Sequence, residues 1–395
     1  MVHNPSRRSI LAWTAVSASR VFGANERIRL GVIGTGGRGQ HLMRMANQAG
    51  GIEWVALCDA WDQRRDAAGQ FAAGAQLAKT GDYRTLLDRK DIDGVIVATW
   101  DHLHSRIAAD ACRAGKDVFV EKPMTSLPAQ GPELVSAVRS TGRVLQVGVQ
   151  QRSISHFVEA KQRFFDSGLI GDVNLVRTFW NANDGYLTPV PPGMDKKPEG
   201  LDWEACLGWL PKIPWDPKRY FNRFAYWDFA TGGQTGGLFV HLVDVVHWYL
   251  GLTALRSAVA LGGIYRYDDG RDTPDTISLI TEYPKRVVVT FEATLCDMQP
   301  KESVDIVFHG SAGRLHIFRG GYRFIPAGAK SKDAEITAPG GPEFVHMGNW
   351  LDCIKSRKQP NASVVDGHYA AMSCHMGNIS YKEKRRVEWS KEWEV

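Results

Sequence analysis

Three glycines near the start of the chain stand between a short apolar run and a stretch of helix-forming residues. The run is Ile28 to Ile33, and the glycines are Gly34, Gly36 and Gly39. In this G-x-G-x-x-G spacing the first glycine permits a tight turn, the second lets the backbone approach a pyrophosphate, and the third lets a helix pack closely on a sheet. Because the N-terminus of such a helix attracts phosphate groups, the spacing predicts a dinucleotide site.

An acidic residue follows at the distance that this kind of site requires. Asp59 stands 20 residues after Gly39, at the end of a second apolar run, Trp54 to Cys58. A carboxylate in this position accepts a hydrogen bond from the ribose 2′-hydroxyl and repels a 2′-phosphate. The sequence therefore predicts NAD, and not NADP, as the cofactor.

Two histidine clusters have the residue types of a metal site. They are Asp101-His102-x-His104 and His241-x-x-Asp244-x-x-His247. Partial ligand sets of this size arise easily by chance. The six cysteines are scattered without any C-x-x-C spacing. We therefore expect no metal site and no disulfide framework, and we expect the cysteines to behave as small core residues.

Strand-like and helical runs alternate over roughly residues 28–148. Strands are expected at 28–33, 54–58, 94–99, 117–121 and 144–148. This alternation predicts a parallel, doubly wound sheet, on which ligands lie at the carboxyl ends of the strands. From the glycine turn and the residues that follow the strands, we predict cofactor contacts by Gly34, Thr35, Gly36, Gly37, Arg38, Gly39, Asp59, Thr99, His104, Glu121 and Lys122.

The pattern changes beyond about residue 153. A helix at 156–167 leads to a strand at 173–180 and then to a long stretch rich in Pro and Trp, 183–228, with little periodicity. A loop of that length inside a compact region is usually functional. Its tryptophans have broad faces that suit sugar rings, although filling a core explains any one of them as well.

The remainder of the chain combines helices with a second set of strands. A helix at about 238–250 precedes strand-like runs at 277–283, 286–294, 304–309 and 314–318, and a helical pattern returns over about 343–382. The short turns between the runs predict a second, largely antiparallel sheet. We expect four segments: a signal peptide (1–24), an NAD-binding domain (25–152), an α/β substrate and oligomerisation domain (153–342), and C-terminal helices that pack back toward the NAD-binding domain (343–395).

The composition is that of a globular protein with room for two cores. The chain has 395 residues, of which 44% are hydrophobic and 23% charged. Its net charge of +5 arises from 48 basic and 43 acidic residues without a long run of either sign. Such a distribution does not indicate a nucleic-acid partner.

The N-terminus has the features of a twin-arginine export signal. Arg7 and Arg8 precede a short apolar stretch, and Ala24 comes shortly before the first strand, although Phe22 stands where a small residue is usual. The apolar stretch is too short to span a bilayer as a helix. We expect export to the periplasm, with a basic tail on a cytoplasmic protein as the alternative.

Two further motifs make the chain resemble the Gfo/Idh/MocA oxidoreductase family. They are Glu121-Lys122-Pro123 after a strand and His241-Leu-Val-Asp244 on a helix, and the resemblance covers nearly everything from Ile28 to Trp389. Within the family, the N-terminus and the motifs V-G-V-Q-Q-R-S and D-C-I-K-S-R-K look like the exported bacterial branch. The resemblance implies an α/β fold: an N-terminal Rossmann parallel sheet plus a C-terminal α/β domain with an open, largely antiparallel sheet, with substrate between them.

The resemblance also implies two catalytic residues. Lys122 matches the family's active-site lysine, whose charge stabilises the alkoxide character that develops on the substrate hydroxyl. Pro123 would orient Lys122 toward the nicotinamide, through a cis bond. His241 matches the catalytic histidine, which takes the hydroxyl proton.

One position departs from the family's pattern. The family carries an Asp four residues before the histidine, and here that residue is Gly237. Because glycine has no carboxylate, the proton relay must be different or weaker, unless Asp244, Asp184 or Asp228 substitutes. We place the candidate substrate contacts at Gln151, Arg152, Trp180, Asp184, Tyr186, Asp228 and Asp244.

Three functions fit these features. The first is an NAD-dependent oxidoreductase that acts on a secondary hydroxyl of a sugar, a sugar derivative or a cyclitol and holds its cofactor tightly. The second is a redox-neutral, NAD-dependent glycoside hydrolase that works by oxidation, elimination, hydration and reduction. The third is a cofactor-binding protein without catalysis, which the glycine at 237 favours. Because an open sheet leaves one apolar face bare, we also expect a homodimer or homotetramer.

Overall fold

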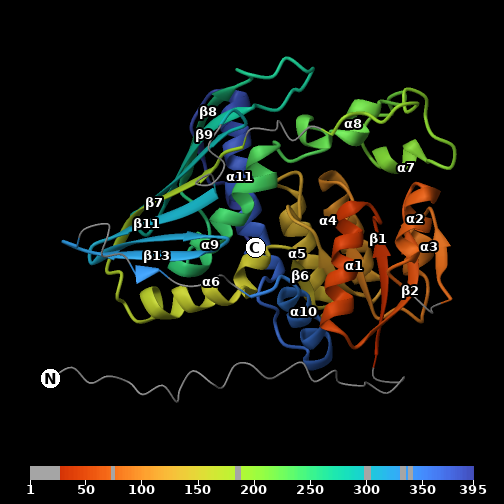
Figure 1. Ribbon diagram of the computed structural model, residues 1–395, viewed down its shortest axis with the longest axis horizontal. Helices are drawn as coiled ribbons and strands as arrows, with labels where there is room; N and C mark the ends of the chain where they lie inside the picture. The colour runs from red at the N-terminus through yellow and green to blue at the C-terminus, as the bar shows by residue number, and fades with distance from the viewer. Residues whose placement is uncertain (1–26, 73–75, 183–187, 298–303, 330–334, 337–340) are drawn as a thin grey trace.

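The chain folds around two sheets that lie side by side (Figure 1). The computed structural model describes residues 27–72, 76–182, 188–297, 304–329, 335–336 and 341–395. The predicted α/β class is confirmed, with a parallel sheet in the first part of the chain and a largely antiparallel sheet in the second. The expected signal at residues 1–24 lies outside the described ranges.

The first sheet is parallel throughout and has the strand order β3-β2-β1-β4-β5-β6. Its strands are β1 (Ile28–Ile33), β2 (Ile52–Cys58), β3 (Ala78–Thr80), β4 (Gly94–Val97), β5 (Asp117–Val120) and β6 (Leu145–Val147). The residues of β1, β2, β4 and β5 are mostly apolar and buried, as in a sheet covered on both faces. The chain runs from β1 toward one edge and from β4 toward the other. The loops that leave β1 and β4 therefore diverge, and the crevice between them is where ligands bind on such sheets.

Helices from both ends of the sequence cover the first sheet. The helices within its own part of the chain are α1 (Gly37–Ala49), α2 (Asp62–Gly69), α3 (Tyr83–Leu87), α4 (Asp101–Arg113) and α5 (Gln130–Thr141). Helix α10 (Phe344–Ser356) packs against α1 and shares a buried cluster with it. The fully buried ring of Trp350 in α10 lies edge-on to Phe119 of β5, with 5.8 Å between ring centroids. The core of the first domain thus includes residues from the last part of the chain.

The second sheet has nine strands in the order β14-β13-β12-β11-β7-β10-β9-β8-β15. They are β7 (Val173–Trp180), β8 (Ser257–Gly263), β9 (Thr276–Tyr283), β10 (Val287–Thr294), β11 (Val304–Gly310), β12 (Gly313–Phe318), β13 (Gly321–Pro326), β14 (Glu335–Ile336) and β15 (Val387–Glu388). The neighbours β7 and β10 are parallel, and the other neighbouring pairs are antiparallel.

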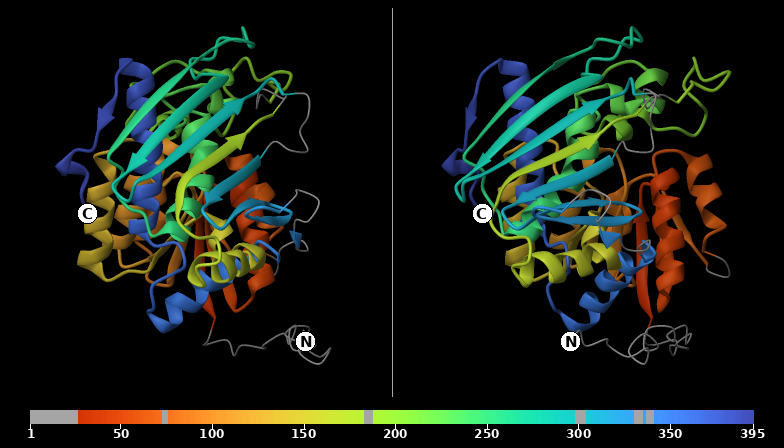
Figure 2. Two further views of the ribbon diagram at one scale, coloured as in Figure 1. Left: turned by 90° about the vertical axis from the view of Figure 1, so that its left-hand side faces the viewer. Right: turned by 60° about the vertical axis from the view of Figure 1, so that its left-hand side comes forward.

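Helices cover one face of this second sheet, as Figure 2 shows. They are α6 (Ser155–Ala160), α9 (Val240–Leu250) and α11 (Val364–Glu383). On β8 and β9 the side chains alternate between this buried face and the opposite face. Leu261 and Ile280 are 69% and 51% exposed on the opposite face, and Val259 is paired with Ile280 across the strands. An apolar patch is therefore left uncovered on the outer face.

The long stretch without periodicity lies over the first domain. It contains α7 (Trp203–Leu207) and α8 (Pro217–Phe221), which Figure 1 places above α2 and α4. A separate buried cluster joins it to Trp61 of the first domain, and the cluster consists of Trp61, Leu201, Trp203, Cys206, Leu207, Tyr220 and Phe229. We call residues 200–209 the covering segment.

Short turns of other helix types complete the described chain. The 3-10 turns are Gln150–Ser153, Arg223–Ala225 and Lys391–Trp393, and π-helical turns span Lys161–Asp166 and Thr235–Phe239. None of the helices within the described ranges is long and apolar enough to cross a membrane.

Candidate active site

The turn after β1 requires glycine at two of the predicted positions. Gly34 has a φ of +91°, and a Cβ there would lie 2.6 Å from the carbonyl oxygen of Ala98. A Cβ on Gly39 would lie 2.0 Å from the carbonyl oxygen of Gly34. The first turn of α1 therefore packs directly on the loop that precedes it. The backbone here has the form of a dinucleotide cradle, with the N-terminus of α1 facing the crevice.

Asp59 is held beside this turn by backbone hydrogen bonds. Its carboxylate accepts from the N–H of Thr35 at 2.7 Å and from the N–H of Trp61 at 3.0 Å. An ionised carboxylate has about four acceptor sites. Asp59 can therefore also accept from a ribose hydroxyl, as the sequence predicts.

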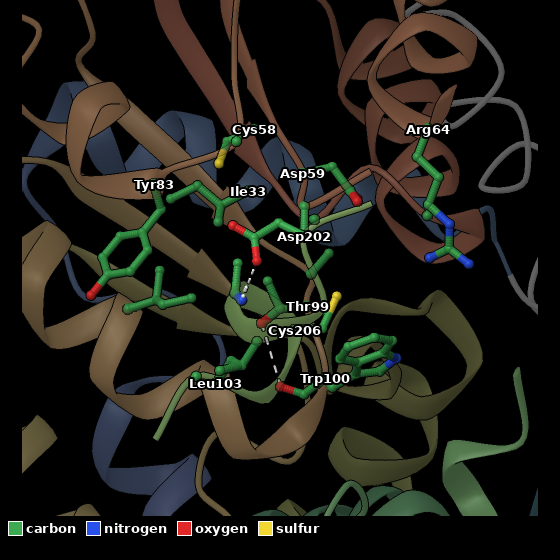
Figure 3. A pocket seen from close by; sticks show the side chains of 18 of the residues that line it. Ile33, Cys58, Asp59, Arg64, Tyr83, Thr99, Trp100, Leu103, Asp202 and Cys206 are labelled. Atoms are coloured by element: carbon green, nitrogen blue, oxygen red, sulfur yellow. Dashed lines mark hydrogen bonds between the residues drawn. The ribbon is translucent and has the colours of Figure 1, made fainter. Parts of the chain in front are cut away.

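A cavity of about 650 Å³ opens at this crevice (Figure 3). Its lining includes residues of the glycine turn, Asp59, and Thr99 after β4. Residues of the covering segment line it as well. The side chains drawn and labelled in Figure 3 are Ile33, Cys58, Asp59, Arg64, Tyr83, Thr99, Trp100, Leu103, Asp202 and Cys206. The glycine cradle, the acidic residue and the cavity between diverging loops together fit a dinucleotide.

Glu121 connects the end of β5 to the glycine turn. Its carboxylate is buried and accepts from Nε of Arg38 at 2.7 Å. Burial raises the pKa of Glu121, but the positive charges of Arg38 and Lys122 outweigh it, so the pKa lies below its ordinary value. Arg38 in turn donates to Glu343 just before α10, at 3.1 Å. Glu121 and Arg38 thus fix the geometry around Lys122.

Lys122 reaches from the first domain to the second. The peptide bond between Lys122 and Pro123 is cis, and Nζ of Lys122 donates to the carbonyl oxygen of Gly237 at 2.6 Å. Burial lowers the pKa of Lys122 to about 8, although Glu121 and Asp101 oppose the shift. At neutral pH the side chain is therefore a half-buried ammonium close to its titration point.

His241 lies one turn after Gly237 on α9 and is buried. Its Nδ1 is buried and has no hydrogen-bond partner in the described part of the chain. Burial, followed by the positive charges of Lys122 and Arg319, holds the pKa of His241 well below its usual value. The imidazole is therefore neutral and able to accept a proton at neutral pH. The structure thus brings the two predicted catalytic residues together.

An aromatic ring fills the space at Gly237. A Cβ on this residue would lie 2.3 Å from Cε2 of Phe224. An aspartate cannot be built there unless the Phe224 ring moves. The departure from the family pattern is therefore more than a missing carboxylate, because the local packing depends on the glycine.

Two of the three proposed substitutes for that carboxylate are bonded to arginines. The buried carboxylate of Asp244 accepts from Nε of Arg152 at 2.8 Å and 3.0 Å. Asp228 accepts from Nε of Arg219 at 3.0 Å. Asp184 lies outside the described residues, as does Tyr186.

Of the remaining predicted substrate contacts, Trp180 lies beside His241, whereas Arg152 pairs with Asp244. The Trp180 ring lies 6.1 Å from the His241 ring, between centroids, so Trp180 belongs to the site. Gln151 and Arg152 are buried, and Arg152 also contacts Asp366 at 3.2 Å. Arg152 and Asp244 thus form a buried ion pair between elements, away from the described lining of the cavity.

The histidine clusters are bonded to protein groups. His104 is buried between two carbonyl oxygens, with Nδ1 2.8 Å from Pro123 O and Nε2 3.1 Å from Thr99 O. It holds the loops after β4 and β5 together and is not among the described residues that line the cavity. His102 lies 3.1 Å from the carbonyl oxygen of Cys206, and His247 lies 2.8 Å from the Tyr283 hydroxyl. The described residues contain no group of three or more side chains able to hold a metal ion.

Several residues of the site belong to no motif that the sequence shows. The guanidinium of Arg64 lies over Tyr220 at 4.9 Å and over Trp61 at 5.7 Å, beside Gly36. Asp202 and Trp209 reach the cavity from the covering segment. The high density of tryptophan in the unpatterned stretch was the one signal that pointed to this region. It did not show on which side of the molecule the stretch would lie.

Comparison with protein families gives two matches. Residues 28–149 match the family described as "Oxidoreductase family, NAD-binding Rossmann fold". Residues 212–316 match the "GFO/IDH/MocA C-terminal domain". The two matched regions together cover more than half of the chain and follow one another in the order of the two sheets.

Curated relatives include inositol 2-dehydrogenases. The enzyme of Gluconacetobacter diazotrophicus is 38% identical over 150 residues, which are 37% of this chain and 44% of that protein. Inositol 2-dehydrogenase 2 of Saccharopolyspora erythraea is 33% identical over 270 residues, which are 67% of this chain and 66% of that protein. The chain thus matches less than half the length of the first relative and about two thirds of the second.

Solved structures share the whole architecture. A levoglucosan dehydrogenase in complex with NADH and levoglucosan superposes with a TM-score of 0.72 at 18% identity, over 92% of this chain and 99% of that one. The WlbA dehydrogenase of Bordetella pertussis, in complex with NADH and UDP-GlcNAcA, superposes with a TM-score of 0.70 at 18% identity. The superposition covers 92% of this chain and 99% of that one. At this identity the likeness supports the fold.

Proposed function

Since the chain belongs to the Gfo/Idh/MocA oxidoreductase family, whose first domain is an NAD-binding Rossmann fold, we propose that it oxidises a secondary hydroxyl of a sugar, a sugar derivative or a cyclitol. One observation carries this proposal. The half-buried ammonium of Lys122, at the carboxyl end of β5, bonds to the turn before the neutral, buried imidazole of His241, and its neighbour Glu121 bonds to Arg38 of the crevice lining.

The residues of the crevice would hold the cofactor, and NAD, when bound, accepts the hydride from the substrate carbon. The backbone of the glycine turn and the N-terminus of α1 would bind the pyrophosphate. Asp59 would accept from the adenosine ribose. Among the sequence-predicted contacts, Thr99 also lines the cavity.

The catalytic pair would act on the substrate hydroxyl. A substrate hydroxyl that replaces the Gly237 carbonyl as the partner of Lys122 would be polarised by the ammonium, which stabilises developing negative charge on oxygen. His241, being neutral, would take the hydroxyl proton. Because position 237 is glycine, no carboxylate one turn earlier assists His241. The rate would then depend more strongly on Lys122 than in a protein with that aspartate.

The relatives' names support a polyhydroxylated ring as substrate. The curated relatives are named for inositol, and the solved structures hold levoglucosan or UDP-GlcNAcA. The Trp180 ring lies beside His241, but it is buried and the Arg319 guanidinium lies over it at 4.9 Å, so it packs within the protein.

A panel assay tests the proposal. Purified protein is incubated with NAD and a series of cyclitols and free sugars, and the absorbance of the reduced nicotinamide is followed. We expect reduction with at least one secondary alcohol in wild type and none in Lys122→Met. A protein that binds NAD but reduces it with no member of the panel would favour the non-catalytic alternative.

Redox-neutral glycoside cleavage is the second candidate. Residues of the covering segment line the cavity and pack on Trp61 of the first domain, which suits a cofactor that stays bound and is restored in each cycle. The test is release of the aglycone from aryl glycosides without added NAD. Release that proceeds through many turnovers without added NAD would favour this candidate, and no release would remove it.

We also propose that the protein is exported with its cofactor already bound. Arg7 and Arg8, at the N-terminus, support this, because the twin-arginine route accepts folded proteins. Cell fractionation of wild type and of Arg7→Lys/Arg8→Lys gives the test. We expect the wild type in the periplasm with nicotinamide bound after dialysis, and the variant in the cytoplasm. An unchanged location would contradict export.

A further inference from the structure

The cavity that contains the glycine turn and Asp59 is also lined by a carboxylate of the covering segment, Asp202. We propose that Asp202 accepts hydrogen bonds from the adenosine ribose of NAD and, together with Asp59, excludes a 2′-phosphate. This inference deepens the proposed NAD site and rests on it. It assigns part of the cofactor's specificity to a segment that lies more than 140 residues after Asp59 in the sequence.

Backbone hydrogen bonds fix Asp202 next to the loop that carries Asp59. The N–H of Asp202 donates to the carbonyl oxygen of Ala60 at 2.8 Å, and the N–H of Asp62 donates to the carbonyl oxygen of Gly200 at 3.1 Å. Trp61 and Leu201 pair between these two bonds as an antiparallel bridge. Because Ala60 directly follows Asp59, the two aspartates stand on adjoining strands of chain at one end of the cavity.

The packing of the covering segment leaves the Asp202 side chain facing the cavity. Its neighbours Leu201 and Trp203 are 3% and 6% exposed, whereas Asp202 itself is exposed and lines the cavity. One oxygen of Asp202 accepts from the N–H of Ala205 at 2.9 Å, which orients the carboxylate. Figure 3 shows Asp59 and Asp202 in the same cavity. A carboxylate that is already oriented loses little freedom when it binds a hydroxyl.

Two of the arginines that line the cavity, Arg64 and Arg84, already contact other groups of the protein. Arg84 pairs with Asp82 at 3.2 Å. Arg64 lies over two aromatic rings with its guanidinium beside Gly36, where the pyrophosphate would bind. Of the four acidic side chains that line the cavity, Asp82 and Glu204 form ion pairs with Arg84 and Lys212, whereas Asp59 and Asp202 form no ion pair within the described residues. A ribose diol finds two acceptors here, whereas a 2′-phosphate meets two negative charges.

One substitution isolates the charge of Asp202. In Asp202→Asn the amide oxygen can still accept from the N–H of Ala205, so the start of α7 (Trp203–Leu207) is preserved. Asp216→Asn is the matched control, because Asp216 accepts in the same way from the N–H of Arg219 at 3.1 Å and is not among the described residues that line the cavity. Asp59→Asn and the Asp59→Asn/Asp202→Asn double variant complete the set.

The experiment measures the dissociation constants of NAD and NADP for the full-length chain by isothermal titration calorimetry. For Asp202→Asn we expect NAD to bind about tenfold more weakly and the preference for NAD over NADP to fall at least as much, since one charge-assisted hydrogen bond is lost. We expect the two single changes to be non-additive in the double variant, because both side chains would contact one ribose. Asp216→Asn should leave both constants unchanged.

Two results would overturn the inference, and they are distinguishable. If Asp202→Asn behaves like Asp216→Asn while the wild type prefers NAD, Asp202 has no role in cofactor choice and the proposed function stands. If the wild type binds neither dinucleotide, or binds NADP more tightly than NAD, the assignment of the site itself is wrong.

Discussion

Nζ of Lys122 lies 2.6 Å from the carbonyl oxygen of Gly237 and donates to it. This bond joins the strand end of the first domain to the helix that carries His241 in the second. The Lys122 ammonium is therefore placed by both domains. A substrate hydroxyl has to compete with a neutral carbonyl, and not with a carboxylate, for this donor.

Replacing Lys122 should abolish most of the turnover. In Lys122→Met the developing alkoxide loses its charged partner, which we expect to lower kcat by about a thousandfold. NAD affinity and the thermal unfolding midpoint should stay close to wild type, and calorimetry with a melting curve checks both. A rate within tenfold of wild type would contradict the assigned role of Lys122.

A plot of kcat/KM against pH should fall on the alkaline side only. Lys122 is charged below its pKa of about 8 and neutral above it, so kcat/KM should fall as the pH rises through about 8. His241 has a pKa well below its usual value, so it stays neutral and no acidic limb should appear near pH 6.5. In Lys122→Arg, whose guanidinium stays charged, the alkaline limb should disappear even if the rate is low. A limb near pH 6.5 in wild type would show that His241 titrates normally.

Restoring the family's aspartate at 237 should require a second change. In Gly237→Asp the new Cβ collides with the Phe224 ring, and we expect a loss of about 1–3 kcal/mol in the free energy of unfolding. In Gly237→Asp/Phe224→Ala the aspartate side chain has room. Adding Gly237→Asp to Phe224→Ala should therefore lower the free energy of unfolding by less than adding it to the wild type.

Gly237→Ala is the control for this series, because it adds the Cβ without the carboxylate. Urea denaturation measures all four variants. If Gly237→Asp is as stable as wild type, the Phe224 ring moves freely and the glycine is not needed for packing.

The uncovered face of the second sheet should be a contact between subunits. Leu261 and Ile280 are well exposed there, and soluble proteins rarely leave such a patch free. We expect a homodimer or homotetramer in light scattering at micromolar concentration, and a shift toward monomer in Leu261→Asp. Leu169→Asp, at a residue 49% exposed that precedes the sheet, is the control and should change nothing. A monomeric wild type would contradict this prediction.

The parallel sheet could be read from the sequence because its strands are buried on both faces. Such strands are short continuous apolar runs, and Ile28–Ile33 and Asp117–Val120 are found close to where they were expected. In the second sheet β8 (Ser257–Gly263) was not predicted. Its Ala, Gly and Ser residues carry a weak strand signal, and their place is decided by pairing with β9.

The site was predictable where a local motif fixes the chemistry. The glycine turn, Asp59 and Lys122 belong to such motifs. The position of Asp202 was not predictable, because it depends on tertiary packing of Trp61 against the covering segment. For the same reason His104 was expected to face the cofactor, whereas it lies between two backbone carbonyls.

The packing of Trp350 against Phe119 also bears on how the chain folds during synthesis. A ribosome completes β6 at residue 147 and makes α10 only at residues 344–356. At about 5–20 residues per second, the face of the first sheet that α10 covers stays without that cover for roughly 10–40 seconds. The core of the first domain is therefore complete only once α10 has been made, more than 200 residues after β5.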